Sequence, residues 1–458
     1  MIYFNNVQQA INDSIERFKK DNLREMFTYR DQLIDYYQYS NTDQYINKYF
    51  GGTLQREIPL YTTNITKKII NRISMVYKDN PIRLYDNESN DDINDLMLDK
   101  NYKLKNMERI HNLVGTMLIH VLWNENEEKI EYRPILKYEV TLNPDNPMEV
   151  MSILYPVQKT TDDFYQHQKD DFIFWSKDEH FLLNSNGNKI SLNENGDTIN
   201  PYGIIPFVTI QPNCVIDEYF NIGEGADIAL ANQQIDISMT MLQHHIRSAG
   251  GQLFVKGRVD TNNIKLGLNK IVMLEDGDLG SVNNTTDINS IMEGIKHQIQ
   301  HICSNHHIAF DFGISTQKSG VAIKLENLEL LEAREDDVEK FRMVEKSIYR
   351  IEQKILEIHM NINLSNDFNI DFAEIEFPDP DKEMIQWDWW IKHGIKDKID
   401  YIMEKDPDKF ESREEAIKYL EERIIQRKKR SNIFNIRPIK EEEEKEEIGP
   451  QRILNVNP

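Results

Sequence analysis

The segment Gly313-Ile-Ser-Thr-Gln-Lys-Ser319 carries the glycine, lysine and hydroxyl residues that phosphate-binding loops use. In a P-loop, backbone N–H groups and the lysine surround the phosphates. That geometry needs a glycine directly before the lysine and a strand leading into the loop. Here Gln317 precedes Lys318, Phe312 stands where a further glycine is needed, and the preceding residues predict a helix. The spacing therefore argues against nucleotide binding at this loop.

A second group has the residue types of a metal site and lies within one predicted helix: His297, His301, Cys303, His306 and His307. His297 and His301 share one helix face, as residues four positions apart do. Zinc needs four converging ligands, which one helix face cannot supply without a partner chain. The ββα context of an HNH-type nuclease is also missing. We therefore interpret these residues as polar positions on a helix and predict no metal.

No acid–base pair stands out among the 77 carboxylates, because pairs at suggestive spacings are expected by chance. A cluster of three tryptophans, Trp387, Trp389 and Trp390, could stack nucleic-acid bases. At helical spacing beside Ile385 and Ile391, the cluster is more typical of a packing anchor. We predict no catalytic residue and no cofactor.

The chain has 458 residues, of which 39% are hydrophobic and 29% charged, and this suits a folded protein of two or three domains. Its net charge of −23 argues against a sequence-reading DNA binder, which would show a basic footprint. No apolar run is long enough to span a membrane. Two cysteines predict a reducing compartment, and the residues after Met1 lack the features of a signal peptide.

Helices are predicted from apolar residues at three- and four-residue steps. The expected ranges are 58–77 with Asn64 as N-cap, 91–98, 104–122, 225–249, 287–308, the residues around Trp387, 396–404, and 412–430 with a capping box at Ser412.

Alternating apolar runs separated by turn residues predict a β-meander or small sheet between residues 130 and 210. Two further strands, at 252–255 and 270–274, are predicted between the helices at 225–249 and 287–308, with residues 275–278 closing the second strand.

The longest helical pattern runs from Val321 to about His359. At 1.5 Å per residue it would be roughly 55–60 Å long. Such a length exceeds what one compact domain needs, and it indicates a spacer or a role in building an oligomer. The glycine-bearing residues 310–320 before it have no period and predict a loop.

Several short motifs in this order resemble the portal proteins of tailed bacteriophages. Ser319-Gly-Val-Ala-Ile-Lys324 is similar to the sequence that closes the tunnel loop of that family. Gly203-Ile-Ile-Pro-Phe-Val208 is similar to the strand before the stem. The other matching segments are Gly223 to Asp227 with Ala231 to Ser238, where Gln233 and Gln234 depart from the family pattern, then Gln252 to Gly257 and Lys392 to Asp397 with the acidic helix after Asp406.

The resemblance implies a predominantly helical α+β fold with the wing, stem, clip and crown regions of portal proteins, assembled as a ring. Its regions would be a wing at 1–222, a first stem helix at 223–250, a clip at 251–286, a second stem helix at 287–309, a tunnel loop at 310–319, a long helix with wing return at 320–395, a crown at 396–430 and an acidic, disordered tail at 431–458.

The resemblance also places the DNA-facing residues of the tunnel loop and of the helix start. They are Phe310, Asp311, Phe312, Gly313, Gln317, Lys318, Ser319, Gly320 and Lys324. Lys318 and Lys324 either meet DNA phosphates or pair with neighbouring acids such as Glu326 and Asp311, and the sequence leaves both open.

A portal protein forms a ring, usually of twelve subunits, at one capsid vertex of the virion after assembly in the host cytoplasm. The implied partners are further copies of the chain, the terminase large subunit, head–tail adaptor and connector proteins, major capsid and scaffolding proteins, and double-stranded DNA that passes without sequence-specific binding. The resemblance implies no membrane and no enzyme activity. The alternatives are a non-portal helical scaffold, or a metal-dependent nuclease that would fail on substitution of His301 or His307.

Overall fold

The computed structural model describes residues 16, 21–50, 60–86, 90–157, 171–184, 188–193, 195–212, 219–248, 252–257, 277–282, 287–309, 327–375, 380–405, 410 and 412–433. The chain divides into two compact units. The first is built from the described residues up to 309 and from 327 to 375, and the second from those between 380 and 433. No helix in these ranges is long and apolar enough to cross a membrane.

The helices of the first unit are α2 (Asp21–Gln38), α3 (Thr42–Tyr49), α4 (Ile65–Ile73), α5 (Asp91–Asp95), α6 (Lys100–Val114), α7 (Gly225–Ser248), α8 (Ile288–Asn305) and α10 (Leu328–Met360). Those of the second unit are α11 (Pro380–Lys392), α12 (Lys398–Lys405) and α13 (Arg413–Ile433). Helix outweighs strand, and the predicted α+β class is confirmed.

Twelve strands occur within the described residues, all in the first unit: β1 (Ile82–Tyr85), β2 (Met117–Asn124), β3 (Lys129–Ile135), β4 (Glu139–Asn143), β5 (Asn146–Pro156), β6 (Phe172–Ser176), β7 (His180–Leu183), β8 (Lys189–Ser191), β9 (Phe207–Ile210), β10 (Gln252–Gly257), β11 (Gly277–Val282) and β12 (Phe368–Asp371). Strands β4 to β8 form an antiparallel meander in chain order, which confirms the predicted hairpins. Strand β9 leaves that meander and pairs with β2 in the sheet β3-β2-β9.

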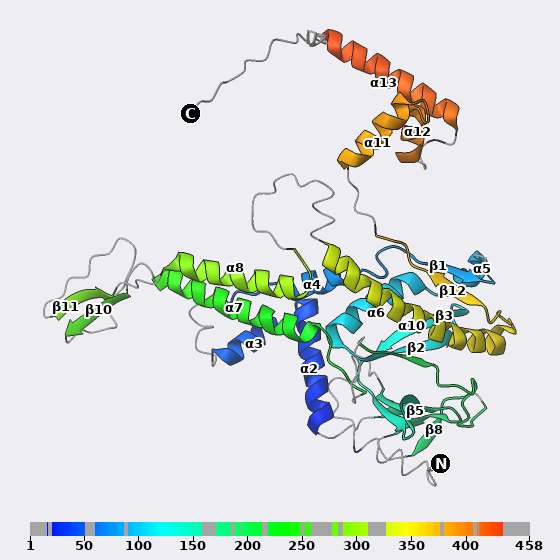
Figure 1. Cartoon of the computed structure of the whole chain (residues 1–458). Helices are drawn as coiled ribbons and strands as arrows, with labels where there is room; N and C mark the ends of the chain where they lie inside the picture. The colour runs from blue at the N-terminus through cyan, green and yellow to red at the C-terminus, as the bar shows by residue number, and fades with distance from the viewer. Residues whose placement is uncertain are drawn as a thin grey trace, which may run out of the picture. The chain divides into compact units, whose positions relative to one another are not determined.

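The main core lies between the sheet β3-β2-β9 and the helices α6 and α10 (Figure 1). Leu104 of α6, Val121 of β2 and Ile355 of α10 are all inaccessible to solvent. A smaller cluster around Tyr138 and Ile153 joins this sheet to the meander. Burial of apolar surface in these clusters is the main stabilising contribution to the first unit.

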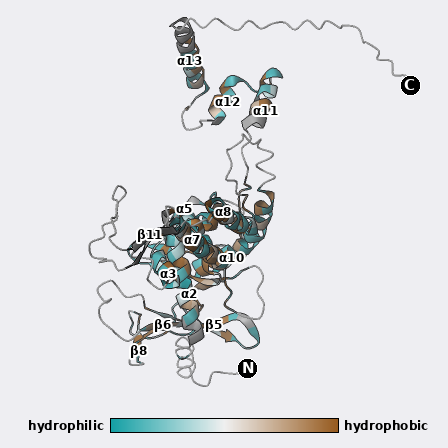
Figure 2. Cartoon of the chain, turned by 90° about the vertical axis from the view of Figure 1, so that its left-hand side faces the viewer, coloured by the Kyte–Doolittle hydropathy of each residue, from teal (hydrophilic) through white to brown (hydrophobic). Residues whose placement is uncertain are grey.

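Helices α7 and α8 lie side by side and form a projection that we name the arm (Figure 1). The hairpin β10-β11 comes between them in sequence and lies beyond their far ends (Figure 1). Figure 2 looks toward the unit from the tip of the arm and shows brown, apolar segments on its helices. The predicted helices at 225–249 and 287–308 are confirmed within a few residues.

Several predicted elements were wrong in extent. The helix expected at 104–122 ends at Val114, and β2 follows from Met117, because Gly115 has a left-handed φ of 80° that ends the helix. The helix expected at 58–77 is shorter and spans only Ile65–Ile73. The partner of β10 is Gly277–Val282, which begins inside the expected closing turn, whereas residues 270–274 lie outside the described residues.

The long helix is described from Leu328 to Met360, and residues 321–326 lie outside the described residues. Residues 431–433, expected to belong to a disordered tail, continue helix α13. The predicted cap at Ser412 is confirmed in part, since its hydroxyl accepts from the Glu415 N–H at 3.4 Å. Residues 434–458 lie outside the described residues.

Candidate functional site: the arm and the base of segment 310–326

All nine residues predicted to face DNA fall in segment 310–326, outside the described residues: Phe310, Asp311, Phe312, Gly313, Gln317, Lys318, Ser319, Gly320 and Lys324. Asp311 and Glu326, the acids considered as partners of the two lysines, lie there too. The structure instead defines the residues on both sides of this segment and the helices that hold them.

The two ends of segment 310–326 lie next to each other. His307 precedes the segment and Glu329 follows it, and their Nδ1 and Oε2 atoms are 3.2 Å apart. After the segment, Asn327 accepts at Oδ1 from Nη2 of Arg72 in α4 at 2.8 Å. Before the segment, the Ile308 N–H donates to the Cys303 carbonyl at 2.8 Å. The residues that flank segment 310–326 are therefore held close together by contacts to the body.

His306 fastens the end of α8 to the start of α7. Its Nδ1 lies 3.2 Å from Oε2 of Glu224, and its Nε2 lies 3.0 Å from Oδ2 of Asp227. Burial alone would lower the pKa of His306, but its hydrogen bonds to the two carboxylates, and their negative charges, raise it to about 9. His306 is therefore protonated at neutral pH, and the ion pairs close the base of the arm. The sequence predicted His306 only as a polar helix position.

A ladder of three polar side chains on α7 holds the residues before α4. Asn232, Asp236 and Thr240 follow each other at four-residue steps and are inaccessible to solvent. The Asp236 Oδ1 accepts from the N–H of Thr63 at 2.8 Å and from its hydroxyl at 2.6 Å. The Thr240 hydroxyl accepts from the Tyr61 N–H at 3.1 Å. Burial raises the pKa of Asp236 to about 7, although the hydrogen bonds from Thr63 and Asn232 favour its charged form.

The N-terminus of α4 is capped by α7. Oδ1 of Asn232 accepts from the N–H groups of Ile65 and Thr66, each at 3.0 Å. These are two of the donors that a helix leaves unpaired at its start. The predicted cap residue, Asn64, makes no capping hydrogen bond from its side chain. That prediction was wrong because the cap comes from a residue far away in sequence, which no local pattern reveals.

The arm has an apolar interior and apolar residues on its surface. Ile235 and Leu242 of α7 are buried with Ile295 of α8. Four large apolar side chains are more than 40% exposed on the same two helices: Leu230, Met241, Ile246 and Met292. Beyond the arm, β10 and β11 pair in antiparallel register from Gln252 opposite Val282 to Gly257 opposite Gly277.

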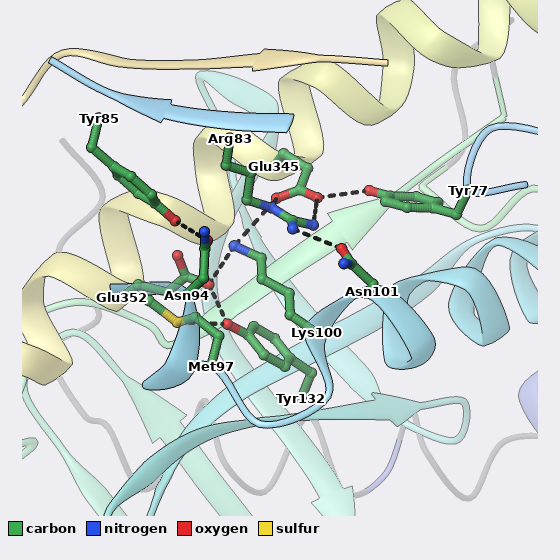
Figure 3. A network of polar contacts seen from close by, with 10 residues as sticks. All are labelled: Tyr77, Arg83, Tyr85, Asn94, Met97, Lys100, Asn101, Tyr132, Glu345 and Glu352. Carbon is green, nitrogen blue, oxygen red and sulfur yellow. Dashed lines mark hydrogen bonds and ion pairs between the residues drawn. The ribbon is translucent and has the colours of Figure 1, made fainter. Parts of the chain in front are cut away.

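Helix α10, which follows segment 310–326, is anchored by a buried network of charges (Figure 3). Glu345 accepts from Nη2 of Arg83 at 2.6 Å and lies 3.2 Å from Nζ of Lys100. Lys100 also pairs with Glu352 at 2.7 Å. Each of these four side chains is at most 5% exposed. Two cations and two anions thus neutralise one another inside the core, which a buried charge requires.

Hydroxyl groups complete this network. The Tyr77 hydroxyl donates to Glu345 at 3.1 Å, and the Tyr132 hydroxyl donates to Glu352. Burial opposes ionisation of Glu345, yet the adjacent Lys100 and Arg83 lower its pKa to about 2. The network joins α10 to β1, α6 and β3, so it fixes the helix that follows segment 310–326.

The structure also describes the histidines of α8 and the tryptophan cluster. Among the described residues, no three His, Cys, Asp or Glu side chains are arranged to hold a metal ion. In the second unit, Trp387 is buried and packs edge-on against Trp390 and Tyr401, as expected for a packing anchor. Trp389 is half exposed and stacks on His393.

Comparison with known proteins gave matches among solved structures only. No protein-family model matches the sequence, and no curated protein sequence does. One similar chain belongs to the virion of a native gene transfer agent particle, with 10% identity, a TM-score of 0.36, and coverage of 71% of this chain and 84% of that one. Another belongs to the neck of an empty particle computed with C6 symmetry, with 12% identity, a TM-score of 0.37, and coverage of 72% and 84%. A chain of the native particle neck computed with C12 symmetry has 10% identity, a TM-score of 0.37, and coverage of 72% and 85%. None of these matches assigns the chain to a family.

Proposed function

We propose that the chain is the portal protein of a tailed bacteriophage, a ring at one capsid vertex through which DNA is packaged and ejected. The observation that carries the proposal is the order of elements from Gly225 onward. Two paired helices bracket a β-hairpin, and a long anchored helix follows after segment 310–326, whose flanking residues His307 and Glu329 are in contact. This is the order of stem, clip, tunnel loop and long helix in the family that the sequence resembles.

In this proposal α7 and α8 form the stem, and the hairpin β10-β11 belongs to the clip. Segment 310–319 is the tunnel loop and faces the passing DNA, with Lys318 in the loop and Lys324 beyond its end as the cations. The clip docks the terminase large subunit during packaging and the head–tail connector afterwards. The other partners are capsid and scaffolding proteins, and the site of action is the virion after assembly in the host cytoplasm.

The charge of the chain suits a conduit better than a binding site. Each copy has a formal net charge of −23, so a ring multiplies that charge around its channel. Such a field discourages DNA from adhering to the wall, because affinity for a duplex depends on cations that neutralise phosphates. DNA that must slide needs contacts that break at every step. The proposal therefore assigns no catalytic activity, cofactor or metal to the chain.

The exposed apolar side chains of the arm fit a ring made of many copies. Leu230, Met241 and Met292 lie on the outside of α7 and α8. Contact with a second copy would remove these side chains from water, which is favourable. In a ring, the arm of each copy has a neighbour on either side that could cover them.

Replacing residues 310–319 by a short glycine-serine linker is expected to leave ring assembly intact and to reduce DNA packaging severely. His307 and Glu329, which flank segment 310–326, are in contact through Nδ1 and Oε2 atoms 3.2 Å apart, so a shorter segment can still connect the two sides. Rings are counted by electron microscopy and packaged DNA by nuclease protection. A replacement by ten glycine and serine residues is the matched control that keeps the length and removes the side chains. Loss of rings in both variants would contradict the assignment of this segment as a tunnel loop.

A further inference from the structure

Helix α7 begins and helix α8 ends at the base of the arm (Figure 1). The start of α7 lies directly against backbone atoms of α6, because a Cβ added to Gly225 would lie 2.2 Å from the Leu113 carbonyl oxygen. The Tyr29 hydroxyl of α2 also donates to the Ala226 carbonyl at 3.3 Å. Only glycine allows two backbones to approach so closely, so this end of α7 is fixed to the body by close packing.

The end of α8 is a hydrogen-bonded turn that contains a left-handed residue. The Ile308 N–H donates to the Cys303 carbonyl at 2.8 Å, and the His307 N–H donates to the Ser304 carbonyl at 3.1 Å. These two bonds make a Schellman motif, in which glycine usually takes the left-handed position. His307 takes that position here with a φ of 56°, which is unfavourable for an L residue. The backbone alone therefore holds the last turn of α8 less firmly than a glycine ending would.

The side chain of His306 joins this turn to the start of α7. Its two ring nitrogens lie 3.2 Å from Oε2 of Glu224 and 3.0 Å from Oδ2 of Asp227. The histidine side chain is 8% exposed, whereas the two carboxylate side chains are 60% and 53% exposed. Both ring nitrogens of an imidazole can donate at the same time only when the ring is protonated. The double contact therefore requires the cationic form of His306.

The surroundings of His306 favour that cation at neutral pH. Burial lowers its pKa, but the contacts with Asp227 and Glu224 outweigh burial and raise the pKa to about 9. The C-terminal end of a helix also favours a cation, and α8 ends at His306. Burial and the charge of Asp227 raise the pKa of Tyr29 in α2 above its ordinary value of 10.0, so this hydroxyl stays neutral in the range where His306 titrates.

We propose that His306, with Glu224 and Asp227, forms an ionic clasp that can release the end of α8 while α7 stays fixed against α6. In the closed clasp, the last turns of α8 place the Ile302 and Cys303 side chains in the main core. When the imidazole loses its proton, one ring nitrogen can no longer donate, and the carboxylate that faces it loses its hydrogen bond. Helix α8 is then the movable helix of the arm. The proposal does not depend on whether the chain forms a ring.

The release should depend on pH in one direction. A histidine whose pKa rises on folding contributes its full stabilisation below its ordinary pKa of 6.5, and this contribution is lost as the pH rises through about 9. Because both carboxylates are more than half exposed, solvent weakens their pairing with His306. We therefore expect the open fraction of the α8 end to increase about tenfold between about pH 7 and about pH 10.

The thiol of Cys303 reports the release, because it lies three residues before His306 and is 3% exposed. The test uses the full chain with Cys214→Ser, which leaves Cys303 as its one cysteine. The rate of alkylation by iodoacetamide is divided at each pH by the rate for a peptide of residues 299–307, which corrects for ionisation of the thiol. The corrected rate should rise about tenfold between about pH 7 and about pH 10. In the same background, His306→Gln should react about tenfold faster already at about pH 7 and show no further rise.

Two further variants separate the clasp from other effects. Glu224→Gln removes one of the two partners from an exposed position, should increase the rate about threefold, and keeps the test valid if His306→Gln folds poorly. His301→Gln is the matched control, because His301 is an exposed histidine of the same helix, and it should react at the rate of the unsubstituted background. Hydrogen exchange followed by mass spectrometry locates the opening. Peptides of α8 should exchange faster in His306→Gln, and peptides of α7 and β2 should not.

Each of four results would overturn the proposal. Unchanged alkylation in both His306→Gln and Glu224→Gln would show that the clasp does not hold α8. An equal increase in His301→Gln would show that the effect is not specific to the clasp. A corrected rate that falls as the pH rises would contradict the assigned charge of His306. Equal acceleration of exchange in α7, α8 and β2 would mean that the whole unit opens, with no fixed helix in the arm.

Discussion

Substitution of Glu345 by glutamine is expected to lower the free energy of unfolding of the first unit by about 3–5 kcal/mol. The change removes one anion from a buried set of two anions and two cations. Arg83 and Lys100 then share Glu352 as their one remaining carboxylate in this network, at 5% exposure or less. A buried charge without a partner is among the few single defects that cost this much.

Glu357→Gln is the matched control on the same helix. Glu357 pairs with Lys354 at 2.7 Å, but both side chains are almost half exposed. Exposed pairs contribute about 0–1 kcal/mol, so this variant should unfold close to the wild type. Guanidinium denaturation followed by circular dichroism measures the free energy of unfolding of both variants. Equal stabilities of the two variants would show that the buried network contributes no more than a surface pair.

The effect of Glu345→Gln should also depend on pH in a defined direction. The pKa of Glu345 in the folded chain is lowered from its ordinary value of 4.5 to about 2, because Lys100 and Arg83 outweigh the effect of burial. Its ion pairs therefore stabilise the fold fully above about pH 4.5. This contribution is lost as the pH falls toward 2. The difference between wild type and variant should shrink over that interval, and a difference that grows on acidification would contradict the assigned charge state.

Gly115→Ala is expected to destabilise the first unit by at least about 3 kcal/mol. Gly115 has a φ of 80°, which L residues rarely adopt. A Cβ there would also lie 2.1 Å from the Asn221 carbonyl oxygen and 2.5 Å from the Gly223 nitrogen. Both are backbone atoms of the residues that lead into α7, so they cannot rotate away as a side chain could. The start of the arm would have to move.

Two other glycines distinguish the cost of the backbone strain from the cost of the steric clash. Gly203 has a φ of 62° but open space around it, so Gly203→Ala reports the backbone strain alone and should cost about 1–2 kcal/mol. Gly294 lies inside α8 with open space and an ordinary helical backbone, so Gly294→Ala should stabilise by roughly 0.5–1 kcal/mol. Thermal unfolding of the three variants ranks their stabilities. If Gly115→Ala were no less stable than Gly203→Ala, the close crossing would not exist as described.

The sequence was most informative where periodic patterns are long. The helices at Gly225–Ser248 and Ile288–Asn305 were predicted within a few residues, and in the second the isoleucines recur at helical steps. The structure adds that Asp287 caps the second helix. Strand β11 was missed since Gly-Asp-Leu-Gly-Ser-Val has no alternation of apolar residues. Its pairing with β10 determines its structure more than its own composition does.

Contacts between distant residues could not be predicted. Arg83 and Glu345 are 262 positions apart, and neither lies in a motif that would mark it as buried. The cap of α4 and the ion pairs of His306 are likewise supplied by residues far along the chain. The DNA-facing residues proposed from the family resemblance remain a prediction.

The mass of the assembled protein tests the portal proposal most directly. Light scattering on the purified chain, followed by electron microscopy of stained particles, should show rings of about twelve copies of 54.2 kDa with a central hole. A species that stays at 54.2 kDa at high concentration and cuts DNA when divalent ions are added would contradict the proposal.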